Sequence, residues 1–565
     1  MAGFAPWFGP FRAALLLSTK IFPVENSWDC RWDLAIFHLM EGKDARYRRP
    51  GKGLDPIFQN MFAISNIGDR GRSPSVGTRR VGGAKTVTSM SFWDCRLTKK
   101  EFILLVTATL VAATLHLAPV LHSGLGTVLT YLLPAVSYFS PMTSFFFFAC
   151  SQFLPFPAGS PHNPAQAGVL VWLPIVLLCY HRVNLRNLWF LWPVLPFLIW
   201  FALLTGQAIY LPNTDYVKSL VYSVMACQMV NESKGQHLKC LIGLCFGALL
   251  VMTAYWASEL GLPVEVSDWG GDREGFQRMG SVRADAVMVW PALLIGLSGL
   301  LGAQIAFASR SSPTSSPKWL TYATLILTVL SLPPLVSTMS HGAFAGFAML
   351  MMAVVWALWT AGKGGAFANP RFQLLLRGCA AGVAAVVFLF AIDAFQLQTK
   401  VLSMKTYYKS TSDKEGAAAS RTGVWHDSIN TILSYPLFGI AVTGDQEVIT
   451  SEYAAQGWYL SHNIFLDFGR ATGITGMALL AFFFFNPAWR MWRSGDHLRY
   501  LPFLLTHFAL LIFWMSLSFT FYKTFWVFWM LAAMAGRVTS PARLGQRQPP
   551  QLNLSKRAAR NSFGS

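Results

Sequence analysis

Charged residues are scarce in this chain. Asp, Glu, Lys and Arg together make up 13% of its 565 residues, whereas a soluble globular protein has about 25%. The deficit comes from long blocks with almost no charge, and a membrane span needs about 20 such residues. The composition, with 53% hydrophobic residues, therefore indicates one membrane domain instead of a string of soluble domains.

Cysteine pairs with metal-site or redox spacing are also absent. None of the eight cysteines forms a CxxC pair, and most lie in apolar runs, where a free buried thiol is the expected state. The sequence therefore predicts neither a disulfide framework nor a zinc site.

Acidic residues are few beside basic ones, 26 against 45, and the formal net charge is +19. In a soluble protein this excess would suggest nucleic acid as a partner. No basic stripe interleaved with aromatic residues forms a recognisable nucleic-acid module, however. In a membrane protein Lys and Arg collect in cytoplasmic loops beside anionic headgroups. We therefore expect membrane lipids, and no nucleic acid, as partners of the basic residues.

Residues 1–97 differ from the rest of the chain. They carry turn formers and mixed charge without a long apolar run or a cleavable signal peptide, which predicts a disordered cytoplasmic extension. Alternatively, translation begins at Met90, because the residues that follow are typical of the short cytoplasmic segment that precedes a first membrane span. We expect the membrane domain at 98–536 and a basic cytoplasmic tail at 537–565.

Apolar segments fill the central part of the chain, and each should be helical because lipid offers the backbone no other partner. The stretch 125–155, interrupted by Pro134 and Pro141, predicts either two short spans or a hairpin that does not cross. The predicted fold class is all-α, a polytopic integral membrane protein with 12 or 14 transmembrane helices. The other segments are 102–121, 167–181, 187–206, 213–230, 237–257, 284–307, 318–336, 342–361, 376–395, 463–485, 498–518 and 520–536.

Charge sets the orientation of these spans. When Lys99 and Lys100 are placed inside, the other short basic connectors also fall inside with either count of spans, as the positive-inside rule requires. Two longer loops then lie outside, at about 258–283 and 397–461, and the second can hold short helices. Loops of this length are usually functional or disordered. Both termini are expected in the cytoplasm.

The second outer loop ends in a spaced pattern of four residues. His462 and Asn463 sit where the loop meets the next span, nine residues precede Gly473, and Gly476 follows three positions later. On a helix this spacing places both glycines on one face and lets a neighbouring helix approach closely. Alternatively, His462 lies at the membrane interface with its hydrogen bonds satisfied and takes no part in any chemistry.

Ionisable residues accompany this pattern. Asp467 and Arg470 follow on the same predicted helix near its outer end, where such groups are costly and usually functional. Earlier in the loop, apolar residues at helical spacing predict an amphipathic helix from near Ser420 to just before Pro436, with Arg421 among its polar positions. The plain alternative for Arg421 is a solvated side chain.

The first outer loop contributes two further arginines. Arg278 and Arg283 lie just before a span, on the same predicted side as Arg421 and His462. They either contact lipid headgroups or bind substrate.

These blocks resemble the O-antigen ligase and polymerase superfamily over about 100–536. The pattern His-Asn, nine residues, Gly, two residues, Gly is similar to the signature of the O-antigen ligases. The block from Arg421 through Trp425 to Gly439 resembles the segment that precedes it, and the loop holding Arg278 is similar to the first functional outer loop. His341 departs from the pattern, because relatives often have arginine there, and it does not inherit that role.

The resemblance implies a glycosyltransferase of the bacterial inner membrane that works at the periplasmic face without metal or cofactor. It implies transfer of an undecaprenyl-diphosphate-linked saccharide, with inversion, to a hydroxyl of a glycan or of lipid A core. Arginines can stabilise the negative charge that develops on the departing diphosphate. A histidine can accept the proton that the acceptor hydroxyl loses as it attacks. The expected roles are diphosphate binding by Arg278, Arg283 and Arg421, catalysis by His462 with Arg421, and support by Asn463, Gly473 and Gly476.

Three alternatives stay open. An exopolysaccharide or O-antigen polymerase of the same superfamily differs from a ligase only in its acceptor. A transporter or lipid-linked sugar flippase would need paired broken helices in two halves, and the prolines at 134, 141, 333 and 334 do not pair in this way. The third alternative is a membrane scaffold without activity.

Overall fold

The computed structural model describes the helical part of the chain, and all of it belongs to the second of two units, Lys85–Ser565. The predicted extension before Phe92, the tail after Gly536 and most of the predicted spans 187–206 and 213–230 lie outside the described residues. The structure describes residues 92, 95–116, 123–154, 160–179, 195–196, 199–200, 221–222, 224–226, 228–229, 235–262, 272–273, 276–277, 286–309, 318–363, 365–403, 417–439, 461–516 and 523–536.

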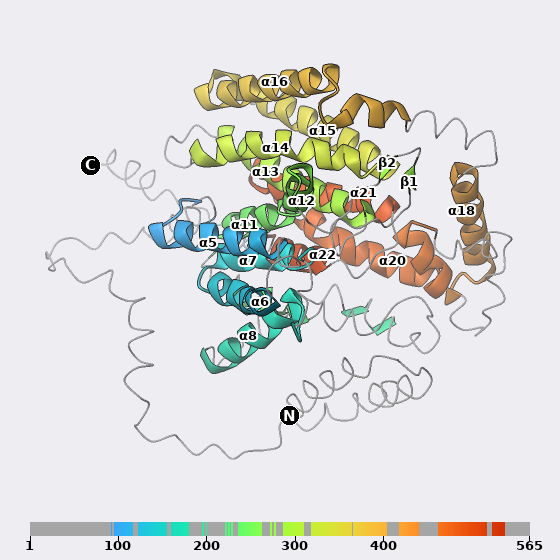
Figure 1. Ribbon diagram of the computed structural model, residues 1–565. Helices are drawn as coiled ribbons and strands as arrows, with labels where there is room; N and C mark the ends of the chain where they lie inside the picture. Colours follow the sequence, from blue (N-terminus) through green and yellow to red (C-terminus); the bar gives the residue numbers. More distant parts are fainter. Residues whose placement is uncertain are drawn as a thin grey trace, which may run out of the picture. The chain divides into compact units, whose positions relative to one another are not determined.

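Helices make up the regular structure of these residues, as predicted, except for one short ladder that the sequence did not predict. This ladder pairs β1 (Asp272–Arg273) with β2 (Phe276–Gln277) in antiparallel register. The helices (Figure 1) are α5 (Lys99–His116), α6 (Ser123–Tyr138), α7 (Pro141–Cys150), α8 (Pro164–Cys179), α11 (His237–Leu249), α12 (Met252–Glu259), α13 (Ala286–Ala308), α14 (Lys318–Ser337), α15 (His341–Lys363), α16 (Pro370–Ala391), α18 (Ala417–Ser434), α20 (Ile464–Arg493), α21 (His497–Ser516) and α22 (Lys523–Ala535).

Several helices are long and apolar enough to cross a membrane, and the protein is a multi-pass membrane protein. Among the described residues there are seven such segments, and the predicted total of 12 or 14 spans stays a prediction. The seven are His237–Glu259, Val289–Ala308, Trp319–Ser337, Gly342–Lys363, Pro370–Ala391, Ile464–Arg493 and His497–Ser516.

The ambiguous stretch 125–155 forms two helices, α6 and α7, joined by a turn at Phe139 and Ser140. A helix of ten residues such as α7 is only about 15 Å long. It is almost wholly buried and lies directly on α11, where a Cβ added at Gly243 or Gly247 would stand 2.1 Å from a carbonyl oxygen of α7. Helix α7 is therefore part of the protein interior.

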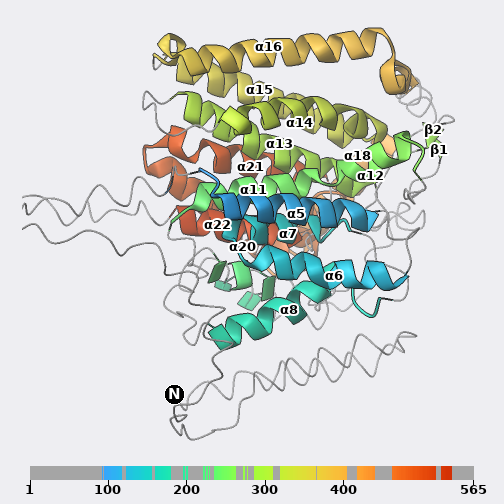
Figure 2. The same ribbon diagram turned by 60° about the vertical axis from the view of Figure 1, so that its left-hand side comes forward.

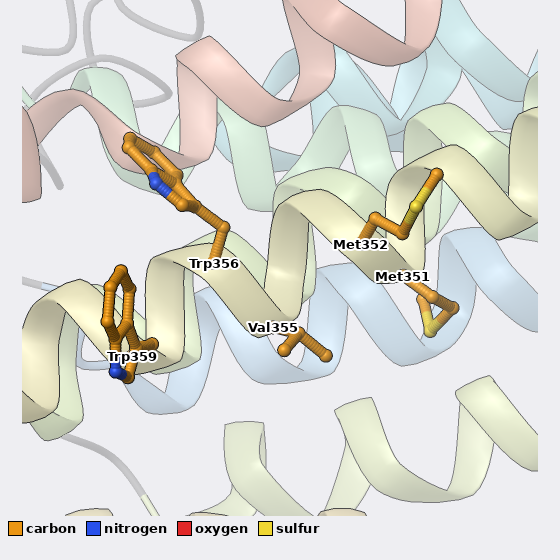
Figure 3. A pocket seen from close by; sticks show the side chains of 5 residues that line it. All are labelled: Met351, Met352, Val355, Trp356 and Trp359. Atoms are coloured by element: carbon orange, nitrogen blue, oxygen red, sulfur yellow. The ribbon is translucent and has the colours of Figure 1, made fainter.

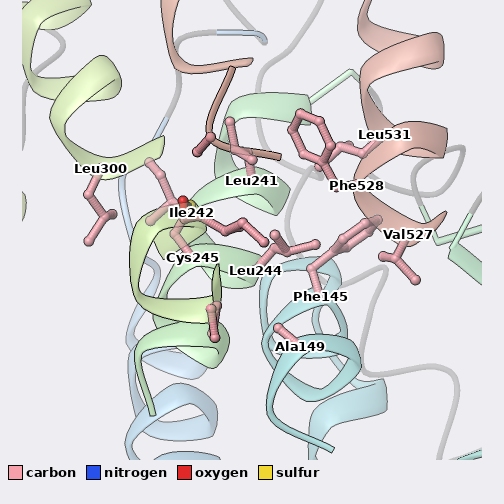
Figure 4. Packing of buried hydrophobic residues seen from close by; sticks show 14 of the residues in the cluster. Phe145, Ala149, Leu241, Ile242, Leu244, Cys245, Leu300, Val527, Phe528 and Leu531 are labelled. Carbon is pink, nitrogen blue, oxygen red and sulfur yellow. Dashed lines mark hydrogen bonds between the residues drawn. The ribbon is translucent and has the colours of Figure 1, made fainter. Parts of the chain in front are cut away.

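The centre of the bundle is a dry apolar core built from α7, α11, α13 and α22. Figure 4 shows Phe145, Leu241, Leu244 and Phe528 interlocking there, and all four are fully or nearly fully buried. The most apolar window of α13 is 100% buried inside the protein, whereas that of α16 is only 6% buried. In Figures 1 and 2, α16 lies at the edge of the bundle, where its apolar side chains are suited to contact lipid.

The two ends of the bundle can be told apart by their contacts. At the end where α20 finishes, here called the Arg493 end, Lys239 Nζ lies 2.6 Å from Glu101 Oε1. At the end where α20 begins, here called the His462 end, Lys400 Nζ donates to Ser337 Oγ at 3.0 Å. Figure 2 shows α18, β1 and β2 at the His462 end as well. The described basic connectors at Lys99, Lys363, Arg371, Arg377 and Arg499 all lie at the Arg493 end.

Packing of the membrane domain begins before its predicted boundary at residue 98. Phe92 and Cys95 are each only 1% exposed. The ring of Phe92 lies 5.9 Å from that of Tyr500, and the Arg499 guanidinium sits over it at 4.3 Å. The packed domain therefore extends back at least to Phe92.

Candidate functional site

Helix α18 carries Arg421 and lies against the beginning of α20. It spans Ala417–Ser434, which confirms the helix predicted from near Ser420 to just before Pro436, although Trp425, Ile429 and Leu433 of its apolar positions are exposed. The Trp425 indole Nε1 donates to the Ser461 carbonyl oxygen at 2.6 Å. This bond fastens α18 to the residue directly before His462, so Arg421 and His462 belong to two elements that are in contact.

His462 sits in a tight bend that its neighbours hold in place. Its φ is 55°, a left-handed value that is uncommon for residues other than glycine. On one side the Ser461 backbone N–H donates to Asp467 Oδ1 at 2.8 Å. On the other side Asn463 Oδ1 caps α20 by accepting the N–H of Phe465 at 3.0 Å. The histidine is partly exposed, so its imidazole can meet a substrate.

Gly473 lies at a break in α20, where the backbone conformation requires a glycine. This residue has φ 75° and ψ −179° inside the helix, and the next N–H, that of Ile474, donates to the Pro436 carbonyl oxygen at 2.7 Å. A Cβ at Gly473 would lie 2.5 Å from the backbone of Leu437. The prediction that Gly473 and Gly476 share one continuous helix face was therefore wrong. Gly473 breaks the helix, and its lack of a side chain lets the loop after α18 pack against the break.

Gly439 repeats this arrangement from the other side. Its φ is 64°, and a Cβ there would lie 2.5 Å from the Arg470 carbonyl oxygen. Between the two fastenings, Ile432 of α18 fills the space over Gly469. Residues 424–439 and 461–474 thus form a closed unit, here called the α18–α20 frame, fastened at Trp425–Ser461 and at Pro436–Ile474.

Among the described residues, two carboxyl groups of the α18–α20 frame have a buried oxygen without a hydrogen-bond partner. These oxygens are Asp427 Oδ2 and Asp467 Oδ2. Arg470 of the same frame is also buried, with only 8% of its surface exposed. Buried polar groups in native proteins usually have a partner, so these two oxygens are candidates to accept a hydrogen bond from a ligand or from water.

The structure does not describe every predicted site residue. It gives the backbone of Arg421 but not the surroundings of its side chain, and Arg278 and Arg283 lie outside the described residues. The strand β2 ends at Gln277, directly before Arg278. Convergence of these arginines on His462 therefore stays a prediction.

A second polar cluster at the His462 end was missed by sequence reasoning. The Lys400 side chain is only 7% exposed, and its Nζ donates to the neutral Ser337 hydroxyl at 3.0 Å. Burial lowers the pKa of Lys400, while the carboxylates of Glu259 and Asp393 oppose this change from a greater distance. In the sequence Lys400 is one of several mixed charges in the 397–461 loop, and nothing there marks it as buried.

The shallow groove on α15 has a different chemistry. It has a volume of about 550 Å³ and is lined by Met351, Met352, Val355, Trp356 and Trp359, as Figure 3 shows. A surface without charged or hydroxyl groups can hold an apolar chain but cannot move a proton. This groove is therefore not a candidate for the chemistry, in contrast to the polar residues at the His462 end.

The fold and this site define a class of protein, a helical multi-pass membrane protein with a polar assembly at one end of its bundle. Residues 326–481 match the O-antigen ligase family model. Over these residues the match confirms the resemblance to the O-antigen ligase and polymerase superfamily, and the matched segment contains α18, the α18–α20 frame and His462. The first outer loop with Arg278 and Arg283 lies outside the match. A comparison with curated proteins found no match.

Proposed function

We propose that the protein is a glycosyltransferase of the O-antigen ligase type. Its proposed donor is a saccharide linked through diphosphate to undecaprenol, and its acceptor is a hydroxyl of lipid A core or of another glycan. The proposed location of the site is the periplasmic face of the bacterial inner membrane, and the clustering of the basic connectors at the opposite end of the bundle supports this orientation. The observation that carries the proposal is the α18–α20 frame, which fastens the helix bearing Arg421 beside the bend bearing His462.

The reaction requires the enzyme to accept a proton from the acceptor hydroxyl and to stabilise the negative charge of the leaving diphosphate. The acceptor oxygen attacks the anomeric carbon from the face opposite the diphosphate and forms the new C–O bond with inversion. The bond from that carbon to the diphosphate oxygen breaks, and its electron pair leaves with the lipid diphosphate. His462 accepts the acceptor's proton, because a neutral imidazole is a base near neutral pH.

Arginines suit the leaving group in this scheme. The planar guanidinium binds two phosphate oxygens at once, and in a partly dry site such charge-assisted bonds are strong. Arg421, with Arg278 and Arg283 from the first outer loop, is proposed to stabilise the diphosphate as its charge grows. The positive charge replaces a metal ion in this scheme, in keeping with the metal-independent chemistry that the resemblance implies.

The experiment is transfer by the purified protein in liposomes, with lipid-linked glycan as donor and either lipid A core or a second lipid-linked glycan as acceptor. We expect His462→Ala and Arg421→Ala each to reduce turnover at least about 100-fold, the scale on which general base or charge stabilisation is lost. The matched controls are His426→Ala on the exposed face of α18 and Arg377→Ala at the Arg493 end.

The acceptor that supports transfer separates the two candidate activities. Product on lipid A core identifies a ligase, and lengthening of the lipid-linked chain identifies a polymerase. Full activity of His462→Ala would refute the base assignment, and transfer to neither acceptor by the unaltered protein would refute the proposed function.

A further inference from the structure

Trp200 joins the α18–α20 frame from a distant part of the chain. Its indole Nε1 donates to the Thr472 carbonyl oxygen at 3.2 Å, across a separation of 272 residues. Its ring stacks on Phe438 with centroids 5.3 Å apart and planes 15° from parallel. Trp200 lies outside the segment matched by the O-antigen ligase model, residues 326–481.

The place of contact is the break in α20. Thr472 is the residue directly before Gly473, whose non-helical backbone interrupts the regular hydrogen bonding of the helix. Ile474, directly after it, donates to the Pro436 carbonyl oxygen at 2.7 Å. One polar group on each side of the break is thus bonded from outside α20, and Trp200 supplies one of these two bonds.

The surrounding groups leave little freedom for this indole. A Cβ added at Gly476 would stand 1.9 Å from Thr472 Oγ1 and 3.2 Å from Trp200 Nε1, so the glycine makes room first for Thr472 and then for the tryptophan bonded to it. Phe438 belongs to the loop that also carries Pro436. The tryptophan therefore contacts both halves of the frame, α20 through a hydrogen bond and the loop after α18 through stacking.

We infer that Trp200 is a positioning residue for His462. It fixes the angle at which the first half of α20, Ile464–Thr472, leaves the break, and this angle sets where the bend at His462 lies relative to α18. A hydrogen bond to a backbone carbonyl holds the chain itself, and misplacement of a reacting group by about 1 Å can cost as much as 100-fold in rate. The expected effect on turnover rests on the proposed function, whereas the expected effect on the position of the helix does not.

The chain offers a matched control on the other side of the break. Trp529 Nε1 donates to the Phe483 carbonyl oxygen of α20 at 2.9 Å, and its ring is fully buried. Trp200→Phe and Trp529→Phe each delete one indole-to-carbonyl bond to α20 and keep an aromatic ring. Trp200→Phe removes its bond in the half that leads to His462, and Trp529→Phe removes its bond in the half that leads to Arg493.

The test compares the two variants in turnover, thermal unfolding and hydrogen–deuterium exchange of residues 464–472. For Trp200→Phe we expect kcat to fall about tenfold with donor KM within twofold, faster exchange in 464–472, and a melting temperature close to that of the unaltered protein. For Trp529→Phe we expect a lower melting temperature with kcat and exchange in 464–472 retained.

Unchanged kcat or unchanged exchange in Trp200→Phe would overturn the inference, as would equal losses of kcat in both variants. The exchange measurement needs no catalysis. It therefore tests the mechanical part separately from the His462→Ala experiment, whose failure would instead remove the proposed function.

Discussion

Two assemblies at opposite ends of the helix bundle are held together by different kinds of contact. Near the Arg493 end, the ion pair of Glu101 with Lys239 and the Arg499 guanidinium over Phe92 are contacts between side chains. At the His462 end, the α18–α20 frame is fastened by hydrogen bonds to the backbone carbonyls of Ser461 and Pro436. A side chain can shift rotamer to absorb a change, whereas a bonded backbone cannot. We therefore expect changes at the His462 end to appear in activity and changes at the Arg493 end to appear in stability.

Among the changes that test this comparison of the two ends, the largest effect is expected from Gly473→Ala. Alanine at a left-handed φ costs about 1–3 kcal/mol, and its Cβ would lie 2.5 Å from the Leu437 backbone, so the α18–α20 frame must separate. We expect transfer to fall about 100-fold in a protein that still inserts in the membrane. The control is Gly382→Ala in α16, where a Cβ meets nothing within 4 Å. Equal activity of the two variants would show that the frame is not needed for transfer.

An intermediate effect, on stability, is expected from Glu101→Gln. Glu101 is only partly buried, so removing it from the ion pair costs about 1–3 kcal/mol, between the values for exposed and fully buried pairs. The melting temperature at neutral pH should therefore fall while transfer per folded molecule is retained. The matched control is Lys99→Gln, an exposed neighbour. A loss of transfer without a loss of stability would contradict the division between the two ends.

The same pair predicts a pH dependence. Burial opposes ionisation of Glu101, but the Lys239 ammonium and the Thr98 backbone N–H outweigh it and hold the pKa of Glu101 below its ordinary value of 4.5. A carboxyl group with a lowered folded pKa stabilises the protein fully above its unfolded pKa and loses this contribution as pH falls through the folded value. The melting-temperature difference between the unaltered protein and Glu101→Gln should therefore be constant above about pH 5 and shrink in more acidic solution.

The smallest effect is expected from removing residues 1–89. Phe92 is the first of the described residues and is already packed in the core, so we expect a protein that starts at Met90 to keep its melting temperature and transfer activity. Removing residues 1–95 would also delete Phe92 and Cys95 from the core, and this longer truncation should be less stable. Loss of activity in a stably inserted protein lacking only residues 1–89 would contradict the prediction that this extension is dispensable.

Much of the fold follows from hydropathy, because lipid forces apolar segments into helices. The predicted 498–518 and 520–536 lie within two or three residues of α21 and α22. The predicted start of α16 at residue 376 was late, because its first turns carry arginines that hydropathy rejects. The helix begins at Pro370, after the Asn369 cap accepts the N–H of Arg371, a signal of capping and not of hydropathy.

The candidate site was less predictable. Asn463 and its neighbours follow local rules, since an asparagine before an apolar run caps a helix. The break at Gly473 does not follow local rules, because the N–H of Ile474 donates to the carbonyl oxygen of Pro436, which belongs to another segment. Trp200 and Lys400 carry no local signal either, since their partners Thr472 and Ser337 are distant in sequence. Such long-range fastenings are set by tertiary packing.

The discontinuity in α20 also bears on how the protein meets its bilayer. A continuous helix passes any tilt imposed by membrane thickness along its whole length, whereas a broken helix can absorb it at the break. The half of α20 toward Arg493 is bonded to Trp529 of α22, and Ser461, shortly before the other half begins, is bonded to α18. A change of membrane thickness is thus expected to act first on the half toward Arg493, while the bonds from Trp200 and Pro436 at the break keep the bend at His462 in place.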